Sequence, residues 1–186
     1  MEGVWKMYRN SLLDACVLKP KFDQFNNLYT LMITTNGYKK VPFTPMQFLD
    51  MELKQHGSSL KGAKEAAKAV LKSNSVNPIM IPRTPLVHIW FPTEAMRNSE
   101  NCMYFALHHV EDVKPYTENH SIAVLMNYEE IIVPVPHSKL KKQWGKAKDY
   151  LSTTLLKQFY KDPLYSNAEQ QIMLKCAEIN EEYVIH

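Results

Sequence analysis

The segment from Gly57 to Lys72 has the pattern of an amphipathic helix whose two faces differ in charge. At about 100° per residue, its lysines lie within about 80° of one another, and its apolar residues lie on the opposite side. The lysines are Lys61, Lys64, Lys68 and Lys72, and the apolar residues are Leu60, Ala63, Ala67, Val70 and Leu71. The apolar face must pack against another element, so the chain has to fold against one side of this helix and leave the lysines outside.

The lysine face suits a polyanion. A helix rises about 1.5 Å per residue, so these four cations span about 16 Å. Nucleic acid is the polyanion with the closest charge spacing, and each phosphate that is neutralised releases counterions. The alternative is a solvated helix face with no partner.

Charge is unevenly distributed along the chain, although the formal net charge is only +3. Residues 39–72 carry seven lysines and three acidic residues, a net of +4, and residues 137–161 carry seven lysines and one acidic residue, a net of +6. Residues 94–130 have a net of −5, from seven acidic and two basic residues, and residues 162–186 have a net of −4, from five acidic residues and one lysine. The local field steers a charged partner, so two basic blocks and two acidic blocks predict a molecule with electrostatically distinct sides.

The second basic block also has helical periodicity. His137 and Ser138 open a long helix whose apolar residues recur at helical spacing. They are Leu140, Trp144, Ala147, Leu151 and Leu155, and they lie opposite Lys139, Lys142 and Lys146. We hypothesise that residues 58–72 and 139–148 form one basic, DNA-binding surface; a solubilising helix face is the alternative for the second block.

The remaining pattern predicts an α+β fold. Apolar or β-branched runs indicate strands near residues 11–18, 28–34, 39–43, 78–82, 86–91, 103–110, 121–126 and 131–135. Asn36-Gly37 is typical of a hairpin turn, and Thr44-Pro45 with Gln47 has the form of a capping box that starts a helix. We therefore expect a mostly antiparallel sheet of about seven strands, covered by helices over residues 45–56, 60–72 and 138–159.

The expected domains are a DNA-binding domain over residues 1–161 and an acidic C-terminal extension over residues 162–186, helical around residues 167–179. No apolar run reaches the roughly 18 residues of a membrane span, and the first residues lack the apolar stretch of a secretory signal, so we expect a cytoplasmic protein without membrane contact.

Composition gives little support to catalysis. Three widely spaced cysteines and seven histidines match no compact metal spacing, so no metal site and no cofactor is expected. Cys102 near His108 and His109 could in principle be a thiol nucleophile with a base. No nucleophile elbow or phosphate loop accompanies them, so no catalytic residue is assigned and we do not expect an enzyme.

Two further features bear on how DNA would be held. Ser58 and Ser59 precede the first lysine helix, where they either bind a phosphate together with the leading amides or only cap the helix. Of the 22 basic residues, 19 are lysines, whereas arginine is the usual reader of guanine. This favours backbone contact or A·T-rich sites, although an A·T-rich genome would enrich lysine as well.

A series of short motifs runs through the chain in a characteristic order. It consists of Gly57-Ser58-Ser59-Leu60-Lys61-Gly62-Ala63-Lys64, Asn77-Pro78-Ile79-Met80, Phe91-Pro92-Thr93, Cys102 with His109-Val110, and His137-Ser138. In order and spacing the series resembles the ComK competence transcription factors of Gram-positive bacteria, over roughly residues 10–156. Two positions depart from the family: Ala63 stands where an arginine or lysine is usual, and Lys61 where an aromatic residue is common.

The resemblance implies a transcriptional activator of competence genes that binds paired A·T-rich boxes of double-stranded DNA, mainly through the minor groove. It also implies a homodimer or a dimer of dimers, with RNA polymerase and a Clp protease adaptor as partners. The alternative is a protein-interaction module, or an antagonist of a paralogous regulator, without DNA-binding activity of its own. Combined with the charge pattern, the residues expected at the DNA are Ser58, Ser59, Lys61, Lys64, Lys68, Lys72, Lys139, Lys142 and Lys146.

Overall fold

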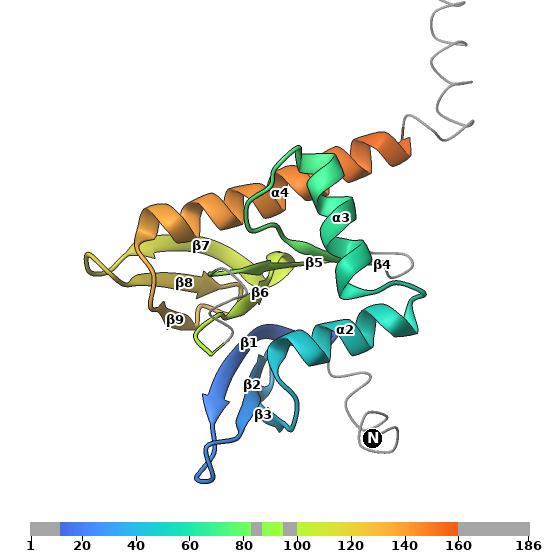
Figure 1. Cartoon of the computed structure of the whole chain (residues 1–186). Coiled ribbons are helices and arrows are strands. Elements are labelled where there is room, and N and C mark those ends of the chain that lie inside the picture. The colour runs from blue at the N-terminus through green and yellow to red at the C-terminus, as the bar shows by residue number, and fades with distance from the viewer. Residues whose placement is uncertain (1–11, 83–86, 95–99, 160–186) are drawn as a thin grey trace, which may run out of the picture. The chain divides into compact units, whose positions relative to one another are not determined.

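The computed structural model describes residues 12–82, 87–94 and 100–159 (Figure 1). The chain divides into two compact units, Met1–Tyr150 and Leu151–His186, and the boundary falls within the last helix. The predicted acidic extension, residues 162–186, lies outside the described residues, as do Arg83 and Arg97. None of the described helices is long and apolar enough to cross a membrane.

The predicted α+β class is confirmed. Six strands form an antiparallel sheet in the order β3-β2-β1-β6-β5-β4. Their bounds are β1 (Ala15–Phe22), β2 (Leu28–Thr34), β3 (Gly37–Val41), β4 (Ile79–Pro82), β5 (Val87–Pro92) and β6 (Tyr104–Ala106). A separate antiparallel sheet, in the order β7-β8-β9, contains β7 (Val110–Pro115), β8 (Ser121–Leu125) and β9 (Glu130–Val133).

The described residues thus contain nine strands, whereas the sequence showed eight strand-like runs and predicted a sheet of about seven strands. The difference arises mainly around Val110. The single strand expected over residues 103–110 ends at Ala106, where a 3₁₀ turn, Leu107–His109, leads into β7. In β7 only Val110 and Val113 are buried, and the other residues are exposed. Two apolar positions among charged ones leave too weak an alternation for a strand to be predicted from sequence.

Helices α2 and α3 start where their caps predict. In α2 (Pro45–Gln55) the Thr44 side chain accepts from Gln47 N, and the Gln47 side chain accepts from Thr44 N, which completes the capping box. Helix α3 (Leu60–Leu71) is capped by Ser59, and α4 spans His137–Phe159. Gly57, just past α2, has φ +70°, a left-handed conformation that glycine adopts without strain.

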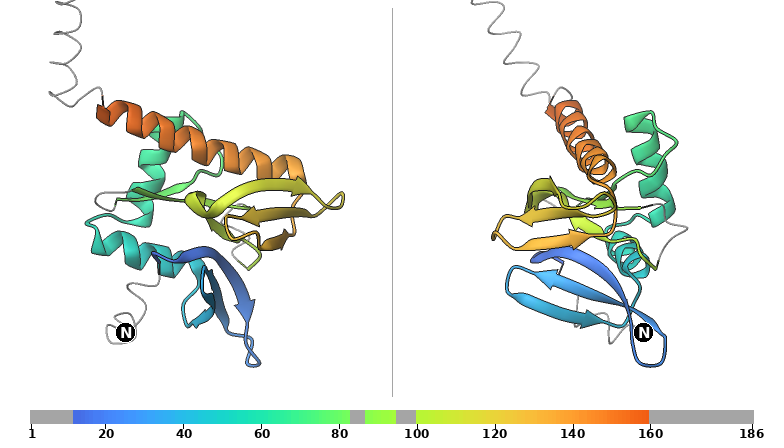
Figure 2. Two further views of the ribbon diagram at one scale, coloured as in Figure 1. Left: turned by 180° about the vertical axis from the view of Figure 1, so that it is seen from behind. Right: turned by 90° about the vertical axis from the view of Figure 1, so that its left-hand side faces the viewer.

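The main core lies between the six-stranded sheet and the first two helices. Helix α2 contacts β1 and β4, and α3 contacts β4 and α2 (Figure 2). Phe48, Leu49 and Leu53 of α2 are fully buried against Leu18 and Trp90 of the sheet, in one cluster with Ala63 of α3. The apolar face of α3 is therefore held inward, which fixes the opposite face of the helix outward.

Lys72 ends α3 in a left-handed conformation, with φ 48° and ψ 37°. A side chain in this region costs about 1 kcal/mol, whereas glycine adopts it freely. Lys72→Gly should therefore raise the free energy of unfolding by about 0.5–1 kcal/mol in urea titrations. Lys68→Gly removes the same charge from the helix interior and should instead lower it by about 1 kcal/mol. Equal effects of the two substitutions would contradict this account of the helix end.

Candidate nucleic-acid interface

Helix α3 presents its lysines outward. Lys61, Lys68 and Lys72 are exposed and Lys64 is half-buried, whereas Ala63 and Ala67 on the opposite side are 5% and 0% exposed. The 3.6-residue repeat puts the alanines on one face of the helix and the lysines on the other. The alanine face packs against β4 and α2, and its small side chains allow a close approach. Three of the four predicted lysines are therefore accessible on the outer side of the helix, and Lys64 lies at the edge of that side.

The N-terminal end of α3 is already occupied by protein groups. Ser59 Oγ accepts from Gly62 N at 3.1 Å, and Asp50 Oδ1 of α2 accepts from Leu60 N at 2.8 Å. The Asp50 carboxylate also pairs with Lys54 at 2.8 Å, and these two contacts lower the pKa of Asp50. Ser59 thus has the cap role that was one of the two alternatives. A phosphate at this helix end would have to share it with a carboxylate.

Ser58, the other predicted serine, belongs to the turn between the two helices. Its backbone N donates to Leu53 O at 2.9 Å, and its side chain is half-buried. The sequence pattern did not reveal Asp50 as part of this turn, because its partner amide lies in the next helix, ten residues further on.

The C-terminal end of α3 leads into a loop, residues 73–77, that is bound to α4. Lys146 Nζ donates to Ser73 Oγ at 3.0 Å, to Val76 O at 3.1 Å and to Asn77 Oδ1 at 3.4 Å, and it also bonds Ser75 Oγ. The pKa of Lys146 is lowered, first by the loss of water around the ammonium and then by nearby Lys142. These contacts join α4 to the loop that directly follows α3.

The same loop forms one wall of a cavity of about 300 Å³. The other wall is made by Lys64 and Lys68 of α3. In the sequence, residues 73–77 are only a polar stretch between a helix and a strand. No local signal marks them as a partner of Lys146, which lies about 70 residues further along the chain.

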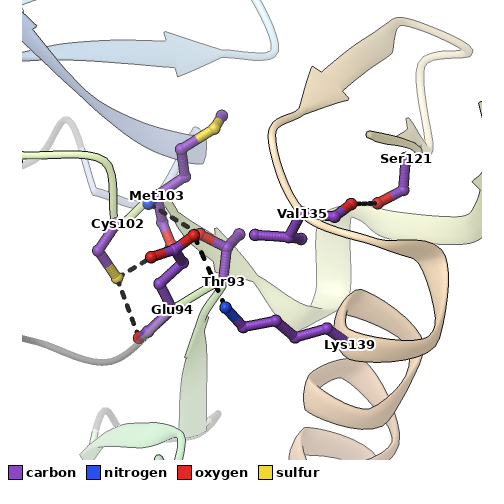
Figure 3. Close-up of polar contacts among 7 residues, drawn as sticks. All are labelled: Thr93, Glu94, Cys102, Met103, Ser121, Val135 and Lys139. Carbon is purple, nitrogen blue, oxygen red and sulfur yellow. Dashed lines mark hydrogen bonds and ion pairs between the residues drawn. The ribbon is translucent and has the colours of Figure 1, made fainter. Parts of the chain in front are cut away.

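The remaining predicted lysines of α4 differ from one another. Lys139 Nζ lies 3.6 Å from Glu94 Oε1 (Figure 3), so its charge is partly offset by a carboxylate that is only 15% exposed. The backbone around Glu94 is held by Cys102 Sγ, which donates to Glu94 O at 3.4 Å, and by Thr93 Oγ1, which accepts from Met103 N at 3.1 Å. Lys142, between Lys139 and Lys146, is exposed.

The described cysteines are buried, and three histidine rings lie close together. Cys102 is 1% exposed and burial raises the pKa of its thiol, so little of it is present as the reactive thiolate. The rings of His88 and His108 lie 4.7 Å apart and those of His108 and His109 lie 4.1 Å apart. Among residues 12–82, 87–94 and 100–159, no group of His, Cys, Asp or Glu has a geometry suited to a metal ion.

The histidine contacts predict a pH effect on stability. The pKa of His108 falls from its usual 6.5 to about 4, because the protein displaces water from its ring and because His109 and His88 add like charge when protonated. Between these two values the unfolded chain binds a proton that the folded chain resists, so stability should fall as the pH drops from about 6.5 to about 4. Because the His108 side chain is exposed, solvent screens much of this effect, and we expect a loss of about 1 kcal/mol. His108→Gln should flatten this part of the profile in urea titrations, and an unchanged profile would exclude this histidine as its cause.

Comparison with known proteins shows the family to which the chain belongs. The family model described as ComK protein matches residues 14–159, which include all nine strands and all three α-helices of the described residues. No curated protein and no solved structure matches the chain. The matched region also includes every residue expected at the DNA and the loop 73–77 that binds Lys146. The chain belongs to the ComK family of competence-related transcription factors.

Proposed function

We propose that this protein activates competence genes by binding A·T-rich double-stranded DNA through the lysines of α3 and α4. The observation that supports this most is the contact of Lys146 with the loop after α3. It joins α4 to the loop that directly follows the lysines of α3, which supports a common surface for the two cationic segments. One helix face rich in lysine is common in soluble proteins. Two such faces close to each other give a stronger local field, which favours a binding surface for a polyanion.

The chemistry of the surface favours contact with the DNA backbone. Duplex DNA carries one negative charge per about 1.7 Å of its axis, which matches closely spaced ammonium groups. Lysine acts as a point charge and lacks the planar fork with which arginine reads guanine. We therefore propose that these side chains hold the phosphates, and that A·T selection arises from the shape of the minor groove.

The assembly and partners implied by the family complete the proposal. The protein would act as a homodimer or a dimer of dimers on paired A·T-rich boxes. It would contact RNA polymerase during activation and be delivered to a Clp protease by an adaptor. Residues 162–186 would form an appendage outside the DNA-binding domain.

Fluorescence anisotropy with the full chain tests this function. One labelled duplex should contain two A·T-rich boxes, and a second of equal length should contain G·C pairs in their place. We expect tighter binding of the A·T-rich duplex and a loss of affinity for both as salt increases. Failure to bind either duplex at low salt, with a protein partner recovered instead by pull-down, would replace this proposal with the protein-interaction module.

A further inference from the structure

The cavity between α3 and the loop 73–77 has the chemistry of a phosphate pocket. We propose that it holds one phosphodiester unit of the DNA backbone between Lys64 and Lys68, and that Lys146 is a positioning residue that shapes this pocket without touching the phosphate. This inference rests on the proposed DNA-binding function and assigns one specific contact within it.

The residues that line the cavity include two lysines and no carboxylate, and the nearby Asp50 carboxylate interacts with Lys64 from outside the lining. The lining consists of Lys64, Lys68, Ser73, Asn74, Ser75, Val76 and Asn77. An anion that enters would meet two ammonium groups one helical turn apart, because residues i and i+4 lie on the same side of a helix. Lys64 is half-buried, so its field is less screened by water than that of a fully exposed lysine.

The shape of the cavity favours a sugar-phosphate unit over a bare ion. Its volume of about 300 Å³ exceeds that of a single phosphate group, which leaves room for part of the attached sugar. The Val76 side chain and the aliphatic stems of the two lysines offer apolar surface to a deoxyribose, while the ammonium groups reach the phosphate oxygens. Asn74 is exposed at the cavity and adds an amide donor.

Lys146 is placed to hold the wall of the pocket. An ammonium group has three N–H donors, and four oxygens of the loop lie within hydrogen-bond distance of this one. No donor is left over for a phosphate. The loop is braced further by Asn77 Nδ2, which donates to Ser73 O at 2.8 Å, and by the contact of Ser73 Oγ with Ser75 Oγ at 2.9 Å. Release of Lys146 would therefore free the whole wall.

The first test compares two double variants that remove the same charge from α3. Lys64→Gln with Lys68→Gln should weaken binding of the A·T-rich duplex about 10-fold and lower the magnitude of its salt slope by about 0.9, because one phosphate contact is lost. Lys61→Gln with Lys72→Gln should lower the slope by up to about 1.8, because these side chains lie about 16 Å apart and reach separate phosphates. A loss near 1.8 for the pocket pair, or no loss, overturns the pocket. Absence of binding by the wild-type protein would instead overturn the proposed function.

The second test separates positioning from contact at Lys146. Ser73→Ala with Ser75→Ala removes two acceptors and no charge. If Lys146 shapes the pocket, this neutral variant should lower the salt slope by about 0.9, as Lys146→Gln does, and combining the three changes should add nothing further. If Lys146 contacts DNA itself, the serine variant should keep the wild-type slope while Lys146→Gln loses it, which overturns the assignment. Thermal melts of both variants, together with the single variant Ser75→Ala, identify any loss that comes from unfolding.

Discussion

Replacement of Trp90 with alanine should lower the free energy of unfolding by about 3–5 kcal/mol. Trp90 is 0% exposed and lies in β5, opposite Ile79 of β4 and Ala106 of β6. Its side chain belongs to the cluster that joins the sheet to α2 and α3. An alanine would leave a cavity that neighbouring strands on both sides can close only by giving up their pairing.

Urea unfolding followed by circular dichroism measures this effect. Trp90→Phe should lose only about 1–2 kcal/mol, because it keeps an aromatic ring and removes an indole N–H for which the described residues provide no hydrogen-bond partner. Phe25→Ala is the matched control, because that ring is 75% exposed and its loss should change stability by less than about 0.5 kcal/mol. Similar losses for Trp90→Ala and Phe25→Ala would show that the core is not organised around Trp90.

The dissociation constant for an A·T-rich duplex should rise about 100-fold between about 50 and 200 mM salt. In the proposed complex each protomer contacts four phosphates: Lys61, Lys72 and Lys142 bind one each, and Lys64 and Lys68 share one. In the described part of the chain none of these lysines forms an ion pair, so each is available to a phosphate. Each neutralised phosphate contributes about 0.9 to the slope of log K against log salt.

Anisotropy titrations at several chloride concentrations give this slope directly. A neutral osmolyte, added in place of salt, is the control, because it changes water activity without screening charge. An affinity that hardly changes with salt would mean that the duplex is held by contacts other than ammonium to phosphate.

Local signals in the sequence were sufficient for most of the elements. The boundaries of β2 are those predicted, because a run rich in β-branched and aromatic residues is followed directly by Asn36-Gly37. Helix α2 begins at Pro45 as expected, because its capping box and its proline both act within four residues. By contrast, β7 was not predicted, because its pairing with β8 supplies the order that its own residues do not encode.

The candidate surface could be predicted only in part. The outward direction of the α3 lysines follows from the helical period, so it is contained in the sequence. The contacts of Lys146 with the loop 73–77, and of Lys139 with Glu94, join residues that are far apart in the chain. Whether a lysine faces solvent or binds the protein is decided by such contacts, and charge patterning cannot distinguish the two cases.

The measurement that tests the account most directly is the salt slope of DNA binding for Lys142→Ala, the exposed lysine of α4 that lies beside Lys146. If the lysines of α3 and α4 contact the same duplex, this variant should lower the magnitude of the slope by about 0.9. Lys148→Ala is the control on the same helix, because its ammonium lies 3.4 Å from the centre of the Trp144 ring and should leave the slope unchanged. A wild-type slope for Lys142→Ala, with binding still sensitive to the lysines of α3, would contradict a surface shared by the two helices.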